Sequence, residues 1–161
     1  MSLCIVYYSL SGITRGVAEK IQAACGGDLI EVRPKQPYTT ISAYSRGAKR
    51  ARSEVHDPID PETIDVSSYD TIVLGTPVWA FKPTPVINGA IAALKGCEGK
   101  RAVIFATSGG MPGETLPILR KFLESREAQV AEEMVINRVD LRSDKKVEEL
   151  IEKVKSTESK S

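Results

Sequence analysis

Histidine and cysteine are scarce in this chain of 161 residues. It has one histidine, His56, and three cysteines, Cys4, Cys25 and Cys97, without CxxC spacing. A histidine-based catalytic triad and a histidine-rich metal site therefore lack the side chains that they need. We expect no metal site, and we expect the cysteines to act as small apolar side chains.

The sequence also lacks an excess of one charge and any long apolar run. Its 22 Lys and Arg residues and 21 Asp and Glu residues give a formal net charge of +1, so nucleic acid and anionic membrane are not expected partners. Every apolar run is far shorter than the ~20 residues of a membrane-spanning helix. Residues Met1 to Val6 carry no basic segment or cleavage signal, which predicts no secretory signal peptide and a cytoplasmic location.

Two common nucleotide-binding motifs are missing. The chain contains neither the GxGxxG of dinucleotide-binding folds nor the GxxxxGK[ST] of nucleoside-triphosphate loops. What it does contain is the composition of a soluble globular domain, with 42% apolar and 27% charged residues. We expect one domain over residues 1–155 and a frayed polar tail over residues 156–161.

Strand-like and helix-like segments alternate along the chain. Buried strands are predicted at 3–8, 71–75 and 102–106, where apolar residues are continuous, and weaker strands at 28–32 and 129–136. Apolar residues at helical spacing predict helices between them, around Val17, Ile21 and Ala24, from Pro85 to Leu94, from Leu116 to Leu123, and from Val147 to Val154. The order predicts an α/β fold, a three-layer doubly wound sandwich around a five-stranded parallel sheet.

A further helix is predicted between the second and third strands. Apolar residues recur at Ile41, Tyr44, Ala48, Ala51 and Val55, so we expect a helix over about 41–55 with these residues on its buried face. The opposite face is basic: Arg46, Lys49, Arg50 and Arg52. That face is either simply solvated or a docking patch for an acidic partner or a phosphate.

Ligands of such sheets bind at the carboxyl ends of the strands, where strand order reverses. The loop after the first strand, Ser9 to Thr14, places three hydroxyl groups beside the start of a helix. Hydroxyl donors, free amides and the helix dipole together favour a phosphate monoester. The alternative interpretation is a helix cap with a serine-rich turn.

Two more loops lie at the same predicted edge. Trp79, the single tryptophan, follows the third strand between Pro77 and Pro83, which suits a stacking platform for a flat ring, although tryptophan is more often a core residue. The segment from Thr107 to Gly113 is rich in glycine and lets backbone amides approach a planar ligand, or else is a flexible connector. A phosphate, a flat ring and backbone donors describe flavin mononucleotide (FMN).

These loops resemble those of the flavodoxins. Ser9-Leu10-Ser11-Gly12-Ile13-Thr14 is similar to the flavodoxin phosphate loop [ST]-x-[TS]-G-x-T, Gly75-Thr76-Pro77-Val78-Trp79 to the second loop, and Thr107-Ser108-Gly109-Gly110 to the third. The resemblance, over residues 3–155, implies a flavodoxin-like fold with strand order 2-1-3-4-5 and noncovalently bound FMN. It implies phosphate binding by Ser9, Ser11 and Thr14 with the amides of Leu10, Gly12 and Ile13, and ring binding by Pro77, Val78, Trp79, Ala80, Thr107, Ser108, Gly109 and Gly110.

The resemblance leaves several functions open. We expect an FMN-binding electron-transfer protein that serves a redox partner protein or a small electron acceptor, because no second nucleotide site is visible. The alternative is an NAD(P)H-dependent FMN reductase or quinone oxidoreductase, and a third possibility is a cofactor-free binding domain. A phospho-receiver domain is disfavoured, since Ser9 and Ser11 stand where its acidic cluster would be. Lys82 is expected, as a solvated cation near the ring, to favour the negatively charged reduced flavin.

Overall fold

The computed structural model describes residues 2–160, so that Met1 and Ser161, the ends of the expected domain and tail, lie outside the described residues. Its central sheet contains five parallel strands in the order β2-β1-β6-β9-β10, which confirms the expected 2-1-3-4-5 order. These strands are β1 (Leu3–Tyr7), β2 (Asp28–Glu31), β6 (Thr71–Trp79), β9 (Arg101–Ser108) and β10 (Gln129–Asn137).

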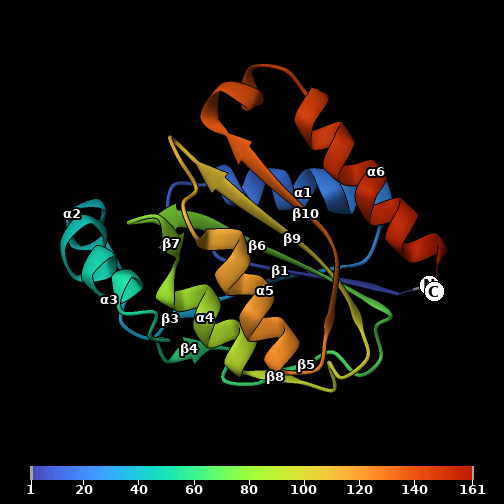
Figure 1. Ribbon diagram of the computed structural model, residues 1–161, viewed down its shortest axis with the longest axis horizontal. Coiled ribbons are helices and arrows are strands. Elements are labelled where there is room, and N and C mark those ends of the chain that lie inside the picture. Colours follow the sequence, from blue (N-terminus) through green and yellow to red (C-terminus); the bar gives the residue numbers. More distant parts are fainter. Residues whose placement is uncertain (1, 161) are drawn as a thin grey trace.

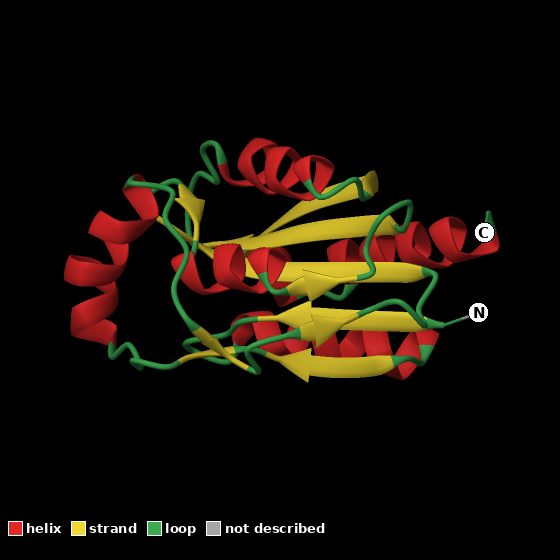
Figure 2. Cartoon of the chain, turned by 90° about the horizontal axis from the view of Figure 1, so that it is seen from below, coloured by secondary structure: helices red, strands yellow, loops and turns green. Residues whose placement is uncertain are grey.

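Helices cover both faces of the sheet (Figures 1 and 2). Alternate residues of the central strands enter two separate apolar clusters: Ile5 packs with α1 and α6, whereas Val6 packs on the side of α4 and α5. Because both faces are buried, the strands read as continuous apolar runs. The helices are α1 (Ile13–Cys25), α4 (Pro85–Ala92), α5 (Thr115–Ser125) and α6 (Lys145–Ser159).

Several short elements were not expected from the sequence. The short strand β7 (Lys82–Pro83) pairs antiparallel with the end of β6. Two further pairs lie outside the main sheet: β3 (Arg33–Pro34) with β4 (Ile59–Asp60), and β5 (Ile64–Asp65) with β8 (Leu94–Lys95). A 3-10 helix, η2 (Arg138–Arg142), connects β10 to α6. Isolated two-residue strands carry too little periodicity to be recognised from a sequence.

The helix expected over 41–55 is shorter, and of its expected buried face only Ala51 is fully buried. It consists of α2 (Thr40–Ser42), a π-helical turn η1 (Ala43–Gly47) and α3 (Ala48–Arg52). The buried residues are Ala43, Gly47 and Ala51, whereas Ile41 and Tyr44 are exposed. The wider π-turn changes the angle between successive residues, so a stripe drawn at 3.6 residues per turn is misplaced. Glu54 takes a positive φ of 55° just beyond the helix, which leaves Val55 outside it.

The predicted polar tail is the last turn of α6. This helix continues to Ser159, and both Thr157 and Glu158 are buried. Arg101 donates a hydrogen bond to the Thr157 carbonyl, which also accepts one from the Lys160 amide at the end of the helix. The frayed tail was therefore a wrong prediction for residues 156–159. In α1, Ala24 is exposed, and the buried stripe is Thr14, Val17, Ala18 and Ile21.

The helical segment of residues 40–52 lies across the end of the sheet toward which the parallel strands point (Figure 2). This end is opposite the one that holds the described ends of the chain (Figure 1). Between this segment and the strand ends lies the cleft described next. Within residues 2–160, no helix is both long enough and apolar enough to span a bilayer.

Candidate functional site

A cleft of about 750 Å³ opens at the carboxyl ends of β1, β6 and β9. All the residues expected to bind the ligand line it, except Ser9, Gly12 and Gly110. The cleft also has walls that the sequence did not predict: Tyr38, Thr39, Thr40, Ala43, Tyr44, Ala48, Ile136 and Arg138. The topology thus brings the three expected loops together and adds the segment from Tyr38 to Ala48 and the end of β10.

The first loop leaves the amino end of α1 open. Gly12 is the N-cap with φ of 95°, a left-handed conformation that glycine adopts without strain, and no side chain caps this helix end. The first-turn amides, including those of Ile13 and Thr14, have no partner within the helix. Ser9 accepts a hydrogen bond from the Gly12 amide and so holds the turn rather than lining the cleft. Ser11 is exposed and makes no hydrogen bond within residues 2–160. The arrangement suits an anion.

Thr14 and Thr107 form a buried link between the first and third loops. Their hydroxyl oxygens lie 2.8 Å apart, and either hydroxyl can be the donor. Two hydroxyl groups carry two protons, and the link uses one of them. The pair can therefore donate one further hydrogen bond to a ligand in the cleft that both residues line.

The segment expected as the second loop is mostly strand. Strand β6 continues to Trp79, and the chain then turns at residues 80–81 into β7. The turn residues Ala80 and Phe81 have positive φ values of 51° and 66°, as the central residues of a type I′ hairpin turn do. Residues without the freedom of glycine are strained there. The Phe81 carbonyl accepts a hydrogen bond from the Glu114 amide, which ties this turn to the start of α5.

Trp79 is held by two tyrosines and still lines the cleft. Its ring meets Tyr8 edge-to-face at 5.8 Å between centroids and Tyr38 at 4.9 Å. Gly47 packs against the same indole, since a Cβ atom there would lie only 2.7 Å from Trp79 Cζ3. The tryptophan is partly buried, packs against the core and also lines the cleft. Its stacking on a flat ring stays a prediction.

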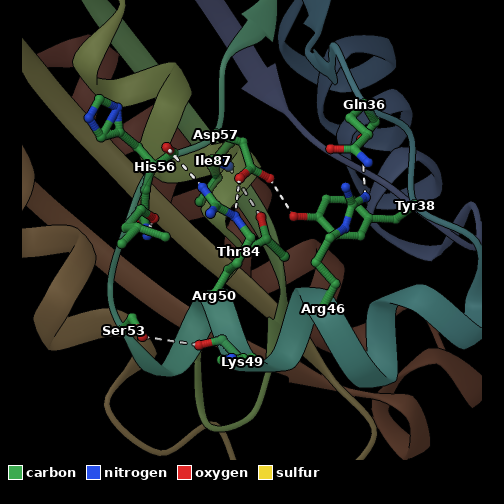
Figure 3. A network of polar contacts seen from close by, with 12 residues as sticks. Gln36, Tyr38, Arg46, Lys49, Arg50, Ser53, His56, Asp57, Thr84 and Ile87 are labelled. Atoms are coloured by element: carbon green, nitrogen blue, oxygen red, sulfur yellow. Dashed lines mark hydrogen bonds and ion pairs between the residues drawn. The ribbon is translucent and has the colours of Figure 1, made fainter.

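A partly buried ion pair between Arg50 and Asp57 fixes Tyr38 and the helical segment beside it (Figure 3). Asp57 accepts a hydrogen bond of 2.5 Å from the Tyr38 hydroxyl and one of 2.7 Å from Arg50 Nε. Burial, together with the hydrogen bond to Asp57, raises the pKa of Tyr38 to about 12. The Arg46 guanidinium lies 4.3 Å from the Tyr38 ring centroid. Arg46 and Arg50, expected on a solvated or docking face, therefore hold a wall of the cleft in place.

The third loop is ordered by Ser108 and flanked by Arg138. The Ser108 hydroxyl accepts a hydrogen bond from the Gly110 amide and donates one to the Gly110 carbonyl. A Cβ atom at Gly109 would lie 3.6 Å from Arg138 Nη2, so the guanidinium reaches the cleft from η2. Arg138 was missed by the sequence analysis because it follows the edge strand, where no flavin motif was expected.

Lys82, in contrast, is not a solvated cation of the cleft. Its ammonium group lies 3.1 Å from Glu54 Oε2 and 2.8 Å from Glu114 Oε2, and Lys82 does not line the cleft. The hydrogen bonds that Lys82 donates to Glu114 and Glu54 raise the pKa of Lys82. Two carboxylates contact this one ammonium group, so Lys82 is not the solvated cation that the sequence predicted. Its effect on the potential of a bound ring stays a prediction.

The fold and the cleft agree with what comparison with known proteins finds. The sequence profile of the flavodoxin family matches residues 2–152. The chain belongs to the flavodoxin family. No curated protein matches the sequence.

Solved structures of flavodoxin-like proteins superimpose on this flavodoxin over almost its whole length. A candidate flavoprotein from Bacteroides eggerthii DSM 20697 is 28% identical with a TM-score of 0.76, covering 94% of this chain and 96% of that one. A flavoprotein from Lactobacillus acidophilus NCFM in complex with FMN is 21% identical with a TM-score of 0.69, covering 92% and 97%. An NADH:FMN oxidoreductase in its apo form is 18% identical with a TM-score of 0.65, covering 98% and 88%.

Proposed function

We propose that this flavodoxin binds FMN noncovalently in the cleft and carries electrons. The observation that carries the proposal is that one cleft joins an uncapped helix amino end to an aromatic wall. An FMN complex in a protein of the same fold supports it. FMN would supply the redox chemistry, and the protein would bind and orient it and tune its potential.

The residues of the cleft fit the parts of FMN. The phosphate would lie at the amino end of α1, with the Ser11 hydroxyl and the first-turn amides as donors. Trp79 and the loop at Gly109 would flank the isoalloxazine ring. Leu10, Pro77 and Val78 give this part of the cleft an apolar lining that excludes water. Arg138 would provide a positive charge beside a ring that becomes anionic when reduced.

A reductase is the second candidate function. The similar NADH:FMN oxidoreductase supports it, whereas the absence of a second nucleotide-binding motif in the sequence favours a carrier. Stopped-flow mixing with NADH and NADPH distinguishes the two functions. A carrier leaves the flavin absorbance unchanged on the timescale of turnover, whereas a reductase bleaches it.

Titration of the apoprotein with FMN and with riboflavin tests the proposed cofactor. Each hydrogen bond to a charged phosphate contributes about 1.5–3 kcal/mol, so several of them make FMN bind tighter by orders of magnitude. Equal affinities for the two flavins would contradict the phosphate site. A colourless protein that binds neither flavin would support a cofactor-free binding domain instead.

A further inference from the structure

The exposed large apolar side chains of the described chain all lie in, or within two residues of, segments that line the cleft. They are Ile41, Tyr44, Phe81, Met111 and Val139, with exposed fractions from 61% for Phe81 to 83% for Tyr44. Tyr44 lines the cleft, and Ile41, Phe81 and Val139 each follow directly after a residue that lines it. Met111 lies two positions beyond Gly109, another lining residue. We call these five residues the apolar rim. Clustered exposed apolar side chains mark interaction sites.

The segments around the cleft carry more unpaired cations than unpaired carboxylates. Several cations have no ion pair within residues 2–160: Arg46, Lys49, Arg52, Arg138 and Arg142. Glu54 and Glu114 both bind Lys82, which leaves one negative charge in excess, and Asp140 keeps its charge although it accepts a hydrogen bond from the Asn137 amide. The five unpaired cations outnumber these two negative charges by three. Although the whole chain has a net charge of only +1, the surroundings of the cleft therefore present unpaired positive charge.

We propose that the apolar rim and the cations around it form the docking surface for an acidic redox protein. This inference rests on the proposed function, because it assumes that the redox-active group lies in the cleft. The partner would place apolar side chains on the rim, with its acidic side chains opposite Arg52 and Arg142. In the exchange, a reduced acidic partner loses one electron and the flavin gains it. Oxidation of the partner thus balances reduction of the flavin.

The arrangement of the rim favours a protein over other occupants. A small acceptor inside the cleft would contact Tyr44 but would leave Met111 and Val139 uncovered, since neither lines the cleft. A second copy of this chain would bring the same cations face to face, because a twofold interface pairs a surface with itself. A partner protein with an acidic surface can pair its carboxylates with the cations and pack its apolar side chains on the rim. Protein interfaces commonly have such complementary potentials.

The first experiment uses an acidic [2Fe–2S] ferredoxin as a probe. Chemically reduced ferredoxin is mixed with the oxidised FMN-bound protein in a stopped-flow instrument. We expect the second-order rate constant to fall roughly tenfold or more from low to physiological salt, as in electrostatically steered association. The charge reversals Arg52→Glu and Arg142→Glu should lower the low-salt rate several-fold. Lys160→Glu, at the exposed carboxyl end of α6, is the matched control and should leave it unchanged.

The second experiment tests whether the apolar rim contributes to protein docking independently of the cations. Met111→Ser and Ile41→Ser should slow electron transfer from ferredoxin but leave the oxidation of the reduced protein by ferricyanide unchanged, because a small anion does not cover the rim. Equal rates for both rim variants and wild type with ferredoxin would overturn the docking surface. So would a rate that rises with salt. Tighter binding to phosphatidylserine vesicles than to ferredoxin, lost in Met111→Ser, would assign the rim to a membrane surface instead.

A measurement without electron transfer keeps this inference distinct from the proposed cofactor. Oxidised ferredoxin is added to the isotope-labelled protein as purified, and amide chemical shifts are followed. We expect shifts confined to residues 40–52, 80–82, 109–114 and 138–142. If these shifts occur in a protein that does not bind FMN, the docking surface is supported and the cofactor is rejected. If the protein binds FMN but shows no shifts, the cofactor is supported and the docking surface is rejected.

Discussion

The hydroxyl oxygens of Thr14 and Thr107 lie 2.8 Å apart, although the residues are 93 positions apart in the chain. The link joins the first turn of α1 to the end of β9, and both residues are buried. It therefore sets the distance between the segment expected to bind phosphate and the segment expected to bind the ring.

Thr14→Val should lower the free energy of unfolding of the apoprotein by about 1–3 kcal/mol, because it leaves the buried Thr107 hydroxyl without its partner. Thr14→Ser keeps the hydroxyl and is the control. Urea unfolding of both variants measures the difference. An unchanged unfolding midpoint for Thr14→Val would show that the link contributes no stability.

Ser11→Ala should weaken FMN binding without lowering stability. The Ser11 side chain is exposed and makes no hydrogen bond within residues 2–160. We expect apoprotein stability to change by less than about 0.5 kcal/mol. FMN affinity should fall about 10- to 150-fold, the equivalent of one hydrogen bond to a charged group. Fluorescence titration with FMN and riboflavin is the measurement, and riboflavin affinity should not change. Equal losses for both flavins would place Ser11 away from the phosphate.

Gly47→Ala should disturb the tryptophan wall. An added Cβ would lie 2.7 Å from Trp79 Cζ3, and two tyrosines hold the indole in place. We expect this clash to outweigh the ~0.5–1 kcal/mol that alanine contributes over glycine in a helix, so that stability and FMN affinity both fall. Gly16→Ala in α1 is the matched control, because no atom lies within 4 Å of its added Cβ. It should raise the thermal midpoint. A gain in stability for both variants would show that Trp79 moves freely.

The raised pKa of Tyr38 predicts a loss of stability in alkali. Burial and the hydrogen bond to Asp57 raise it to about 12, above the ordinary value of about 10. The folded state favours the protonated phenol, so this contribution is complete below pH ~10 and is lost as the pH rises toward ~12. Tyr38→Phe cannot ionise, and its free energy of unfolding should decline less steeply between pH 10 and 12. Urea unfolding across that range is the measurement, and equal slopes would contradict the assignment.

Arg138 and Lys82 should differ in their effect on the flavin potential. Arg138 lines the cleft, whereas two carboxylates balance Lys82. A positive charge about 6 Å from an anionic ring stabilises it by roughly 0.7 kcal/mol at water-like screening, which corresponds to about 30 mV. Arg138→Gln should lower the potential at which the flavin becomes fully reduced by about this amount, and less so in high salt.

Spectroelectrochemical titration of Arg138→Gln and Lys82→Gln measures the effect of each side chain on the flavin potential. Lys82→Gln should lower the potential less than Arg138→Gln does, because Lys82 does not line the cleft. A larger shift for Lys82→Gln than for Arg138→Gln would mean that the cation nearest the flavin is Lys82 after all.

The periodicity of the sequence was enough to predict the sheet and its layers. Continuous apolar runs such as Leu3–Tyr7 require cover on both faces, and alternation of strands and helices requires parallel pairing. The phosphate loop and the glycine-rich loop were recognisable because a helix start and a close backbone approach both depend on local residue types. The weaker strand at 129–136 was predicted because apolar and polar residues alternate there, which matches the partly exposed residues of β10.

What the sequence did not determine depends on contacts between distant segments. From the sequence, Arg50 was expected on a solvated or docking face and Lys82 as a solvated cation. Only the tertiary structure shows that Arg50 pairs with Asp57 and that Lys82 pairs with Glu54 and Glu114. The π-turn moved the buried face of residues 40–52 and exposed Ile41 and Tyr44, since the packing of Gly47 on Trp79 decides which side faces inward. Local patterns thus determined the five main strands, the helices α1, α4, α5 and α6, and the three loops that meet at the cleft, because each depends on neighbouring residues. The tertiary structure decided which charges remain unpaired around the cleft, because that depends on groups brought together only by folding.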